Sequence, residues 1–345
     1  DGSVREPGGT ERLVEVDVAG KIIRDVKASI PAIPGQNIYT TIDTRLQQAA
    51  QSVLLGEIQG WNAYLGENRM TSGVVVAMDP QTGEVLAMIS YPTYENNRMA
   101  RVIPAYYYEQ LTADVRDPLL NHSVGAELPA GSVFKLSTAV GALNERVVTP
   151  EQVIETPPLI ITTEKFTPND PGRNREFVDW NEAGFGSLNF LQGLANSSNV
   201  YFYQLGGGTD GVTNVPNDIP GGLGICRLGT YAHALGYGEL PGIELPDQAD
   251  GLIPTPKWKR IAHGENWSTG DTYIASVGQG FVLASPIQVL MSANTIANDG
   301  KLMRPTLVYE ITDSEGNTIQ PFQPDLKWDI TDRKSTRLNS SHRYV

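Results

Sequence analysis

Ser132 and Lys135 are the first residues whose types and spacing suggest chemistry, in the stretch Leu128-Pro-Ala-Gly-Ser-Val-Phe-Lys135. A proline and a glycine precede the serine, and apolar residues recur at helical spacing over Leu136–Leu143, so Ser132 is expected at a helix N-terminus. Residues three apart share one helix face, which lets the Lys135 amine reach the Ser132 hydroxyl. A lysine whose pKa is lowered can activate a serine as a nucleophile, although S-x-x-K alone also fits a capping serine and a solvated lysine.

A second polar group, Ser197-Ser-Asn199, follows between two expected helices, at 187–194 and 200–205. Short polar residues at such a junction are commonly helix caps. Beside a Ser–Lys pair, however, a second hydroxyl can relay a proton to a leaving amine, and an amide can hold the lysine and bind a substrate carbonyl. Ser197 and Asn199 therefore join Ser132 and Lys135 as candidate catalytic residues.

S-x-x-K followed by S-x-N is the order found in penicillin-recognising serine enzymes, whose third motif is K-T-G. The chain resembles the transpeptidase domain of monofunctional (class B) penicillin-binding proteins, and most closely the elongation-type penicillin-binding protein 2 group, from about Leu13 to Tyr309. No K-T-G occurs in the sequence, and Lys334-Ser335 lacks the glycine. The resemblance also rests on Asn37-Ile-Tyr-Thr-Thr-Ile-Asp-Thr-Arg-Leu-Gln47, Val75-Val-Ala-Met-Asp-Pro-Gln-Thr-Gly83, Leu252-Ile-Pro-Thr-Pro-Lys-Trp258, Ser276-Val-Gly-Gln-Gly280, Ser285-Pro-Ile-Gln288 and Ile296-Ala-Asn-Asp-Gly300.

The resemblance implies an α+β fold of the penicillin-binding-protein transpeptidase (serine β-lactamase-like) type, with an antiparallel sheet flanked by helices. Residues 1–36 would be the remnant of an N-terminal pedestal domain, and 37–331 the transpeptidase domain without its K-T-G part. Residues 332–345 change abruptly to a basic composition and resemble translated adapter sequence, so we expect a non-native tail. The chain would then be truncated at both ends.

The resemblance also implies a function, that of a peptidoglycan D,D-transpeptidase acting in cell wall synthesis. Ser132 would attack the penultimate D-alanine carbonyl of a stem peptide, with Lys135 as base, Ser197 as proton relay, and Asn199 holding Lys135 and the substrate amide. An amine of a second stem peptide would accept the acyl group, and β-lactams would acylate the same serine. The implied partner is a membrane glycosyltransferase, and the implied location is the extracytoplasmic (periplasmic) face of the cell membrane, with the family's N-terminal anchor absent from this chain.

Three alternatives share these motifs. A serine β-lactamase has the first two motifs but must also activate a water that removes the acyl group. A penicillin-sensing domain binds the drug without turning over a substrate. A fragment without the K-T-G strand would be inactive and less stable, because a missing core strand exposes sheet edges and apolar surface.

Several expected elements position these motifs. Alternation at 13–18, followed by a turn at Ala19-Gly20, predicts a hairpin, and a strand at 38–41 leads to Asp43 as the N-cap of a helix reaching about Ile58. Its inward face is expected to carry Leu46, Ala50, Val53 and Leu54.

The stretches 73–79 and 84–90 are expected to be adjacent antiparallel strands, joined by a Pro-Gln-Thr-Gly turn and packed against the Ser132 helix. The segment 150–185 is rich in Pro, Asp, Asn and Gly, and is expected to be a partly ordered loop near the cleft. Asp179-Trp-Asn181 would contribute to the rim of that cleft. Further helices are expected at 228–235 and 286–297, before a strand at 304–309.

Composition narrows the functional classes. A net charge of −13 and a pI near 4.8 argue against nucleic acid or an anionic membrane surface as a partner. Cys226 is the single cysteine, so no intramolecular disulfide can form, and the four histidines lack the spacing of a zinc site. The proposed chemistry requires neither a metal nor an organic cofactor. The 345 residues, 40% of them hydrophobic, suffice for a substantial core, and no stretch has the length of a membrane span.

Overall fold

The structure, a computed structural model, describes residues 3–5, 11–27, 34–100, 102–164, 169 and 172–331. Its internal contacts divide the chain into two units, one of residues 1–40 and 308–323 and one of residues 41–307 and 324–345. The expected tail at 332–345 lies outside the described residues. No helix in the described part of the chain has both the length and the apolar character needed to cross a membrane.

The smaller unit consists of two three-stranded antiparallel sheets, ordered β1-β2-β3 and β13-β12-β4. The hairpin expected from the alternation at 13–18 is present between β2 and β3. Its turn uses Gly20 at φ +80°, a conformation that suits glycine. The strands are β1 (Ser3–Arg5), β2 (Glu11–Val16), β3 (Ile22–Asp25), β4 (Asn37–Thr40), β12 (Val308–Thr312) and β13 (Thr318–Gln320).

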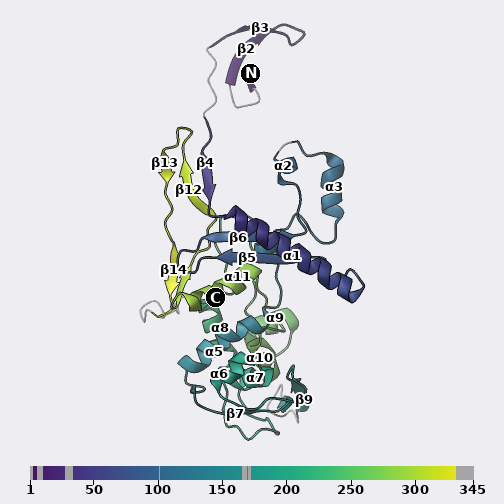
Figure 1. Ribbon diagram of the computed structural model, residues 1–345, viewed down its shortest axis with the longest axis vertical. Helices are drawn as coiled ribbons and strands as arrows, with labels where there is room; N and C mark the ends of the chain where they lie inside the picture. The colour runs from purple at the N-terminus through teal and green to yellow at the C-terminus, as the bar shows by residue number, and fades with distance from the viewer. Residues whose placement is uncertain are drawn as a thin grey trace. The chain divides into compact units, whose positions relative to one another are not determined.

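The larger unit contains the helices of the described part of the chain (Figure 1). The Ser132–Lys135 and Ser197–Asn199 motifs also belong to it. Its helices are α1 (Thr44–Leu65), α2 (Asn96–Met99), α3 (Ala105–Ala113), α4 (His122–Gly125), the 3-10 helix η1 (Gly131–Phe134), α5 (Lys135–Asn144), α6 (Phe190–Ala195), α7 (Asn199–Gly207), α8 (Ile225–Ala234), α9 (Pro256–His263), α10 (Thr269–Ser276) and α11 (Pro286–Ala297). Its strands are β5 (Gly73–Met78), β6 (Val85–Tyr91), β7 (Ile154–Thr156), β8 (Leu159–Glu164), β9 (Arg173–Val178), β10 (Gly186–Leu188), β11 (Lys301–Met303) and β14 (Leu326–Asp329).

The hairpin of β5 and β6 confirms the two strands predicted around the Pro-Gln-Thr-Gly turn. Gly83 has φ +82°, and a Cβ there would lie 2.2 Å from the carbonyl oxygen of Arg304, so this turn requires glycine. Helix α1 packs against both strands, and α4 and α11 also contact β5. Antiparallel strands flanked by helices confirm the α+β class.

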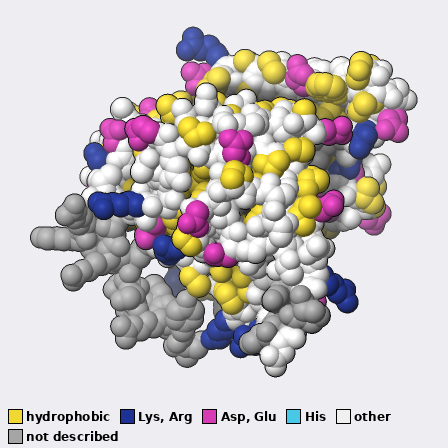
Figure 2. Space-filling view, turned by 90° about the horizontal axis from the view of Figure 1, so that it is seen from below, with side chains coloured by type: hydrophobic (Ala, Val, Ile, Leu, Met, Phe, Trp, Pro, Cys, Tyr) yellow, Lys and Arg dark blue, Asp and Glu magenta, His cyan; other side chains and the backbone are white. Residues whose placement is uncertain are grey.

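Helix α1 begins as predicted but differs in length and burial. Asp43 caps it by accepting hydrogen bonds from two backbone N–H groups, and the helix continues to Leu65, where Gly66 ends it in the left-handed conformation. None of its residues is fully buried. Of the predicted inward face, Ala50 and Leu54 are half-buried, with Leu54 against Gly73 of β5, whereas Leu46 and Val53 are 39% and 64% exposed, so that prediction is only partly correct. The reason is geometric, because a helix lying on two strands covers little of its own circumference. On the face seen in Figure 2, hydrophobic side chains are interspersed with acidic and basic ones.

The segment 150–185, expected to be a loop, instead contains β7 and the hairpin of β8 and β9. Five of the six residues of β9 are exposed, three of them charged, and only Phe177 is buried, so its sequence lacks the apolar signal of a strand. The helix expected at 187–194 is also wrong at its start. Leu188 belongs to β10, and Asn189 starts α6 through a capping box with Gln192, which leaves Leu191 exposed.

The helix that follows Ser132 packs against helices rather than strands. Helix α5 contacts α7 and α8, which corrects the expected packing against the β5–β6 sheet. Helix α7 is apolar around most of its circumference and therefore forms the centre of the largest apolar cluster. Its fully buried residues include Val200, Tyr201, Phe202 and Leu205.

Candidate active site

Ser132 lies where the sequence predicts, in a 3-10 turn that runs directly into α5, and its side chain is exposed. The preceding Gly131 has φ +63°, and its N–H donates to the carbonyl oxygen of Gly278 at 2.8 Å. A Cβ on Gly278 would lie 2.3 Å from the carbonyl oxygen of Gly131, so only glycine permits this approach. The segment 276–280 therefore packs through Gly278 against the turn that carries Ser132.

Lys135 extends from the start of α5 to the Ser197–Asn199 turn. Its amine donates to the Ser197 carbonyl oxygen at 2.6 Å, to Ser197 Oγ at 3.1 Å and to Asn199 Oδ1 at 2.7 Å. The residue is 1% exposed, and its Nζ lies 5.5 Å from the centre of the Phe202 ring. Three of the four predicted site residues are thus joined by hydrogen bonds.

Ser132 is the fourth residue, and it stands one helical turn from the lysine without bonding to it. In the described part of the chain, the hydrogen bonds of Lys135 Nζ go to the Ser197–Asn199 turn and none goes to Ser132 Oγ. Catalytic hydrogen bonds commonly tighten only when substrate binds. The buried amine and the second hydroxyl are therefore hydrogen-bonded, whereas the exposed Ser132 hydroxyl lies one helical turn away from the amine.

The Ser197–Asn199 turn is held in an unusual conformation. Ser197 has φ +50°, in the left-handed region that non-glycine residues rarely adopt and that is commonly retained at functional sites. Ser198 then caps α7 by accepting from the Tyr201 N–H. The expected helix cap is therefore Ser198, whereas Ser197 and Asn199 bond to Lys135.

Asp179 is the residue whose role the sequence did not reveal. It was expected on the cleft rim, but it is 6% exposed and lies beneath the turn. Its carboxylate accepts from Ser198 Oγ at 2.5 Å and from the N–H groups of Asn199 and Val200 at 3.1 and 3.0 Å. A carboxylate at the start of α7 is also favoured by the helix dipole. Asp179 therefore fixes the turn that presents Ser197 and Asn199.

The electrostatics of the site suit a lysine base. Burial lowers the pKa of Lys135 from 10.5 to about 8, and the negative charge of Asp179 opposes this shift. The neutral amine is the form that accepts a proton. The rate of acylation at Ser132 should therefore rise with pH and level off above a midpoint near the lowered pKa.

Replacing Asp179 by asparagine is expected to move that midpoint to lower pH. The substitution removes the charge that favours protonated Lys135, so the amine becomes neutral at lower pH. It also removes a buried acceptor of several hydrogen bonds, which should reduce stability by about 1–3 kcal/mol. The pH dependence of penicillin acylation measures the first effect and thermal unfolding the second. The control is Glu176→Gln, an exposed carboxyl on β9, and an unmoved midpoint in Asp179→Asn would contradict the assignment.

Comparison with known proteins agrees with this geometry. The penicillin binding protein transpeptidase domain matches residues 73–340. The peptidoglycan D,D-transpeptidase MrdA of Salmonella typhimurium is 32% identical over 311 residues, which cover 90% of this chain and 44% of the relative. The chain thus spans about half the length of the curated relatives it matches.

Solved structures show the same fold. The structure of Pseudomonas aeruginosa penicillin-binding protein 2 in complex with WCK 5153 matches with a TM-score of 0.68 and 30% identity, over 88% of this chain and 59% of that one. A structure described as the structural coordination of polymerization and crosslinking by a peptidoglycan synthase complex matches with a TM-score of 0.70 and 29% identity, over 98% and 56%. The chain therefore belongs to the penicillin-binding protein transpeptidase family, among the relatives of penicillin-binding protein 2.

Proposed function

We propose that this chain carries the serine acyl-transfer machinery of a peptidoglycan D,D-transpeptidase, the activity named for its MrdA relatives. The observation that carries the proposal is the buried Lys135 amine, bonded to Ser197 and Asn199 one helical turn after the exposed Ser132. A solvated lysine and a simple cap would not produce this arrangement.

The reaction is an acyl transfer in two steps. Neutral Lys135 takes the proton of Ser132 as Oγ attacks the penultimate D-alanine carbonyl of a stem peptide. The oxyanion is stabilised by the Ser132 backbone N–H at the start of α5. The C–N bond then breaks, and the terminal D-alanine leaves with a proton relayed through Ser197. An amine of a second stem peptide attacks the ester, forms the cross-link and returns a proton to Ser132.

Asn199 has a double role in this proposal. Its Oδ1 accepts a hydrogen bond from Lys135, and its Nδ2 group is a donor suited to a substrate carbonyl. The second oxyanion donor would come from a K-T-G segment, which the sequence lacks. We accordingly assign residues 1–36 to a pedestal remnant and 37–331 to a transpeptidase domain without its K-T-G part. A longer form that includes such a segment is called the extended protein below.

The relatives also suggest the setting of the reaction. A neighbour described as coordinating polymerization and crosslinking in a peptidoglycan synthase complex supports a membrane glycosyltransferase as partner. The stem-peptide substrates proposed for this chain would place the domain on the extracytoplasmic face of the cell membrane.

Product analysis tests the proposal. The extended protein should release D-alanine from a D-alanyl-D-alanine donor peptide and join the remaining acyl group to an acceptor amine. Both products should disappear in Ser132→Ala. Release of D-alanine without any cross-linked product, at saturating acceptor, would indicate a carboxypeptidase instead.

The lifetime of a penicillin adduct separates this function from a β-lactamase. A β-lactamase needs a base that activates the deacylating water, whereas the oxygen atoms of Asp179 already accept hydrogen bonds from Ser198, Asn199, Val200 and Trp180. We therefore expect the adduct to persist for many minutes, whereas an enzyme turning over about 10 times per second would lose it within a second. Intact mass spectra taken after removal of free drug measure this lifetime, and rapid loss would favour the β-lactamase alternative.

A further inference from the structure

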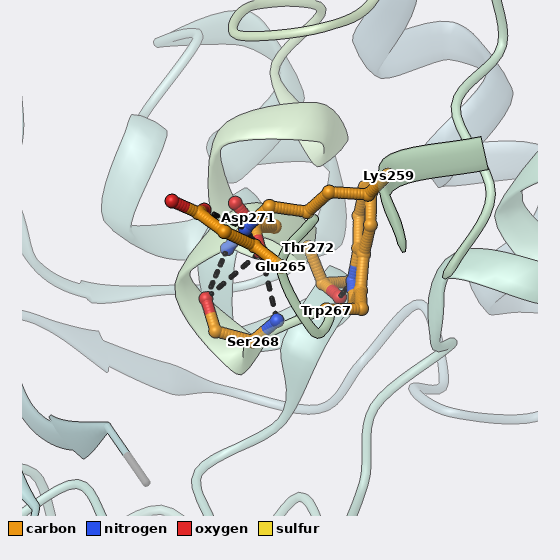
Figure 3. Close-up of polar contacts among 6 residues, drawn as sticks. All are labelled: Lys259, Glu265, Trp267, Ser268, Asp271 and Thr272. Atoms are coloured by element: carbon orange, nitrogen blue, oxygen red, sulfur yellow. Dashed lines mark hydrogen bonds and ion pairs between the residues drawn. The ribbon is translucent and has the colours of Figure 1, made fainter. Parts of the chain in front are cut away.

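Lys259 is a buried lysine that the proposed reaction does not use. It lies on α9 with 4% of its surface exposed, and its amine forms an ion pair with Asp271 Oδ2 at 2.7 Å. Glu265 Oε2 lies 3.4 Å from the same nitrogen, but its side chain is 65% exposed. The Phe281 ring, centred 5.8 Å away, covers another side of the amine. Figure 3 shows Lys259, Glu265 and Asp271 converging at one point.

The ion pair is built into the start of α10. Asp271 Oδ2 also accepts from Ser268 N at 2.7 Å and from Ser268 Oγ at 3.0 Å (Figure 3). Because Ser268 Oγ in turn accepts from the Asp271 N–H at 3.2 Å, the two residues form a capping box. Beside it, Trp267 Nε1 donates to Thr272 Oγ1 at 2.8 Å. Removing Lys259 would leave the Asp271 carboxylate largely buried without its close cation, a costly state that favours rearrangement of this helix start.

Helix α10 in turn contacts both halves of the candidate site. At its C-terminal end, Ser276 Oγ lies 3.0 Å from the Phe202 carbonyl oxygen of α7 and 2.6 Å from the Tyr273 carbonyl oxygen of its own helix, so its single proton is shared between the two acceptors. The Ser276 carbonyl oxygen accepts from Thr138 Oγ1 of α5 at 2.7 Å. Two residues later, the Gly278 carbonyl oxygen accepts from Gly131 N–H beside the nucleophile. One helix thus joins the element bearing Lys135, the element bearing Asn199 and the nucleophile turn.

Close packing makes this connection rigid. A Cβ on Gly206 of α7 would lie 2.4 Å from the Ser276 Cβ, and one on Gly207 would lie 2.4 Å from the Tyr273 ring. These two glycines therefore allow α7 and α10 to approach closely. A shift of α10 along its axis therefore cannot occur without moving α7.

We propose that Lys259 is a positioning residue for acylation, which acts by holding α10 through Asp271 so that Ser132 and the Lys135–Asn199 group stay in register. The inference rests on the proposed function, because its readout is acylation of Ser132. A displacement of about 1 Å between nucleophile and base is sufficient to slow such a step substantially.

The test compares acylation kinetics of folded variants of the extended protein, well below their unfolding temperatures, with a chromogenic penicillin or cephalosporin. Lys259→Met is expected to lower the first-order acylation constant about 10-fold, with little change in drug affinity and with the pH midpoint unmoved. Lys259→Arg, which keeps the charge, should recover most of the loss. The matched control is Lys257→Met, an exposed lysine on the same helix, and should acylate normally.

Each outcome decides the question. A wild-type acylation constant in folded Lys259→Met would overturn the inference and leave Lys259 with a role in stability alone. If Lys259→Met does not fold, Asp271→Asn and Glu265→Gln replace it. Asparagine can keep the capping box, so Asp271→Asn removes the charge that pairs with Lys259 without removing the cap. Slower acylation in Asp271→Asn than in Glu265→Gln supports the inference. Equal acylation constants in these two variants overturn it. Absence of acylation in the unsubstituted extended protein would instead refute the proposed function, and the inference with it.

Discussion

Replacing Ser132 by alanine is expected to abolish covalent labelling by penicillin in the extended protein. In the proposed reaction the acyl-enzyme is an ester of Ser132 Oγ, and Ser197, the other hydroxyl of the site, is half-buried and less accessible than the exposed Ser132. The Ser132 side chain is exposed, so the substitution should change the free energy of unfolding by no more than about 0.5 kcal/mol. Intact mass after incubation with penicillin, together with thermal unfolding, measures both quantities.

The control for this variant is Ser52→Ala, on the exposed side of α1, which should label as the unsubstituted protein does. If the Ser132→Ala variant still binds one penicillin per chain, Ser132 is not the nucleophile. Labelling of the chain of residues 1–345 itself, lost in Ser132→Ala, would show that nucleophile and base assemble without a K-T-G segment.

Replacing Lys135 by methionine should lower the rate of acylation by about 10²–10⁴-fold, the usual contribution of general acid–base catalysis. The residual rate would come from the oxyanion donor and from binding. The variant also leaves Asn199 Oδ1 and the Ser197 carbonyl oxygen without their lysine donor, so it should be less stable as well. Stopped-flow acylation at several pH values measures the effect, and the rise of the rate toward pH 8 should disappear.

Lys135→Arg distinguishes a role of Lys135 as proton acceptor from a role of its positive charge. An arginine side chain can donate to the Ser197–Asn199 turn but remains protonated at any pH where the protein folds, so it cannot accept the proton of Ser132. We expect acylation as slow as in Lys135→Met together with better-preserved stability. A near-normal rate in Lys135→Arg would show that the positive charge matters and that another group is the base.

The four candidate site residues could be chosen from the sequence, because the signals that point to them are local or lie in short motifs. Ser132 and Lys135 share a face through one helical turn, and the structure places Lys135 on the Ser197–Asn199 turn. The Asp43 cap and the Gly83 turn are equally local, since each depends on the conformation of a few neighbouring residues. The helical spacing of apolar residues also predicted α7 and α11.

Contacts between residues that are far apart in the chain could not be predicted from the sequence. Asp179 is a single acidic residue in a polar stretch, and nothing local shows that its carboxylate binds a turn some twenty residues later. Strand β9 has exposed residues on both faces and buries only Phe177, so it shows no apolar alternation that would indicate its pairing with β8. The packing of α5 on α7 and α8 also depends on neighbours that periodicity does not identify.

The most direct test of the central claim is to locate the acyl group. The extended protein is incubated with a D-alanyl-D-alanine donor peptide, quenched in acid, digested, and its peptides are weighed. The account predicts that the peptide containing Ser132 gains the mass of the donor acyl group, with one D-alanine released for each acyl group bound. Acylation at Ser197 or at any other residue, or D-alanine release without an adduct on Ser132 at any quench time, would contradict it.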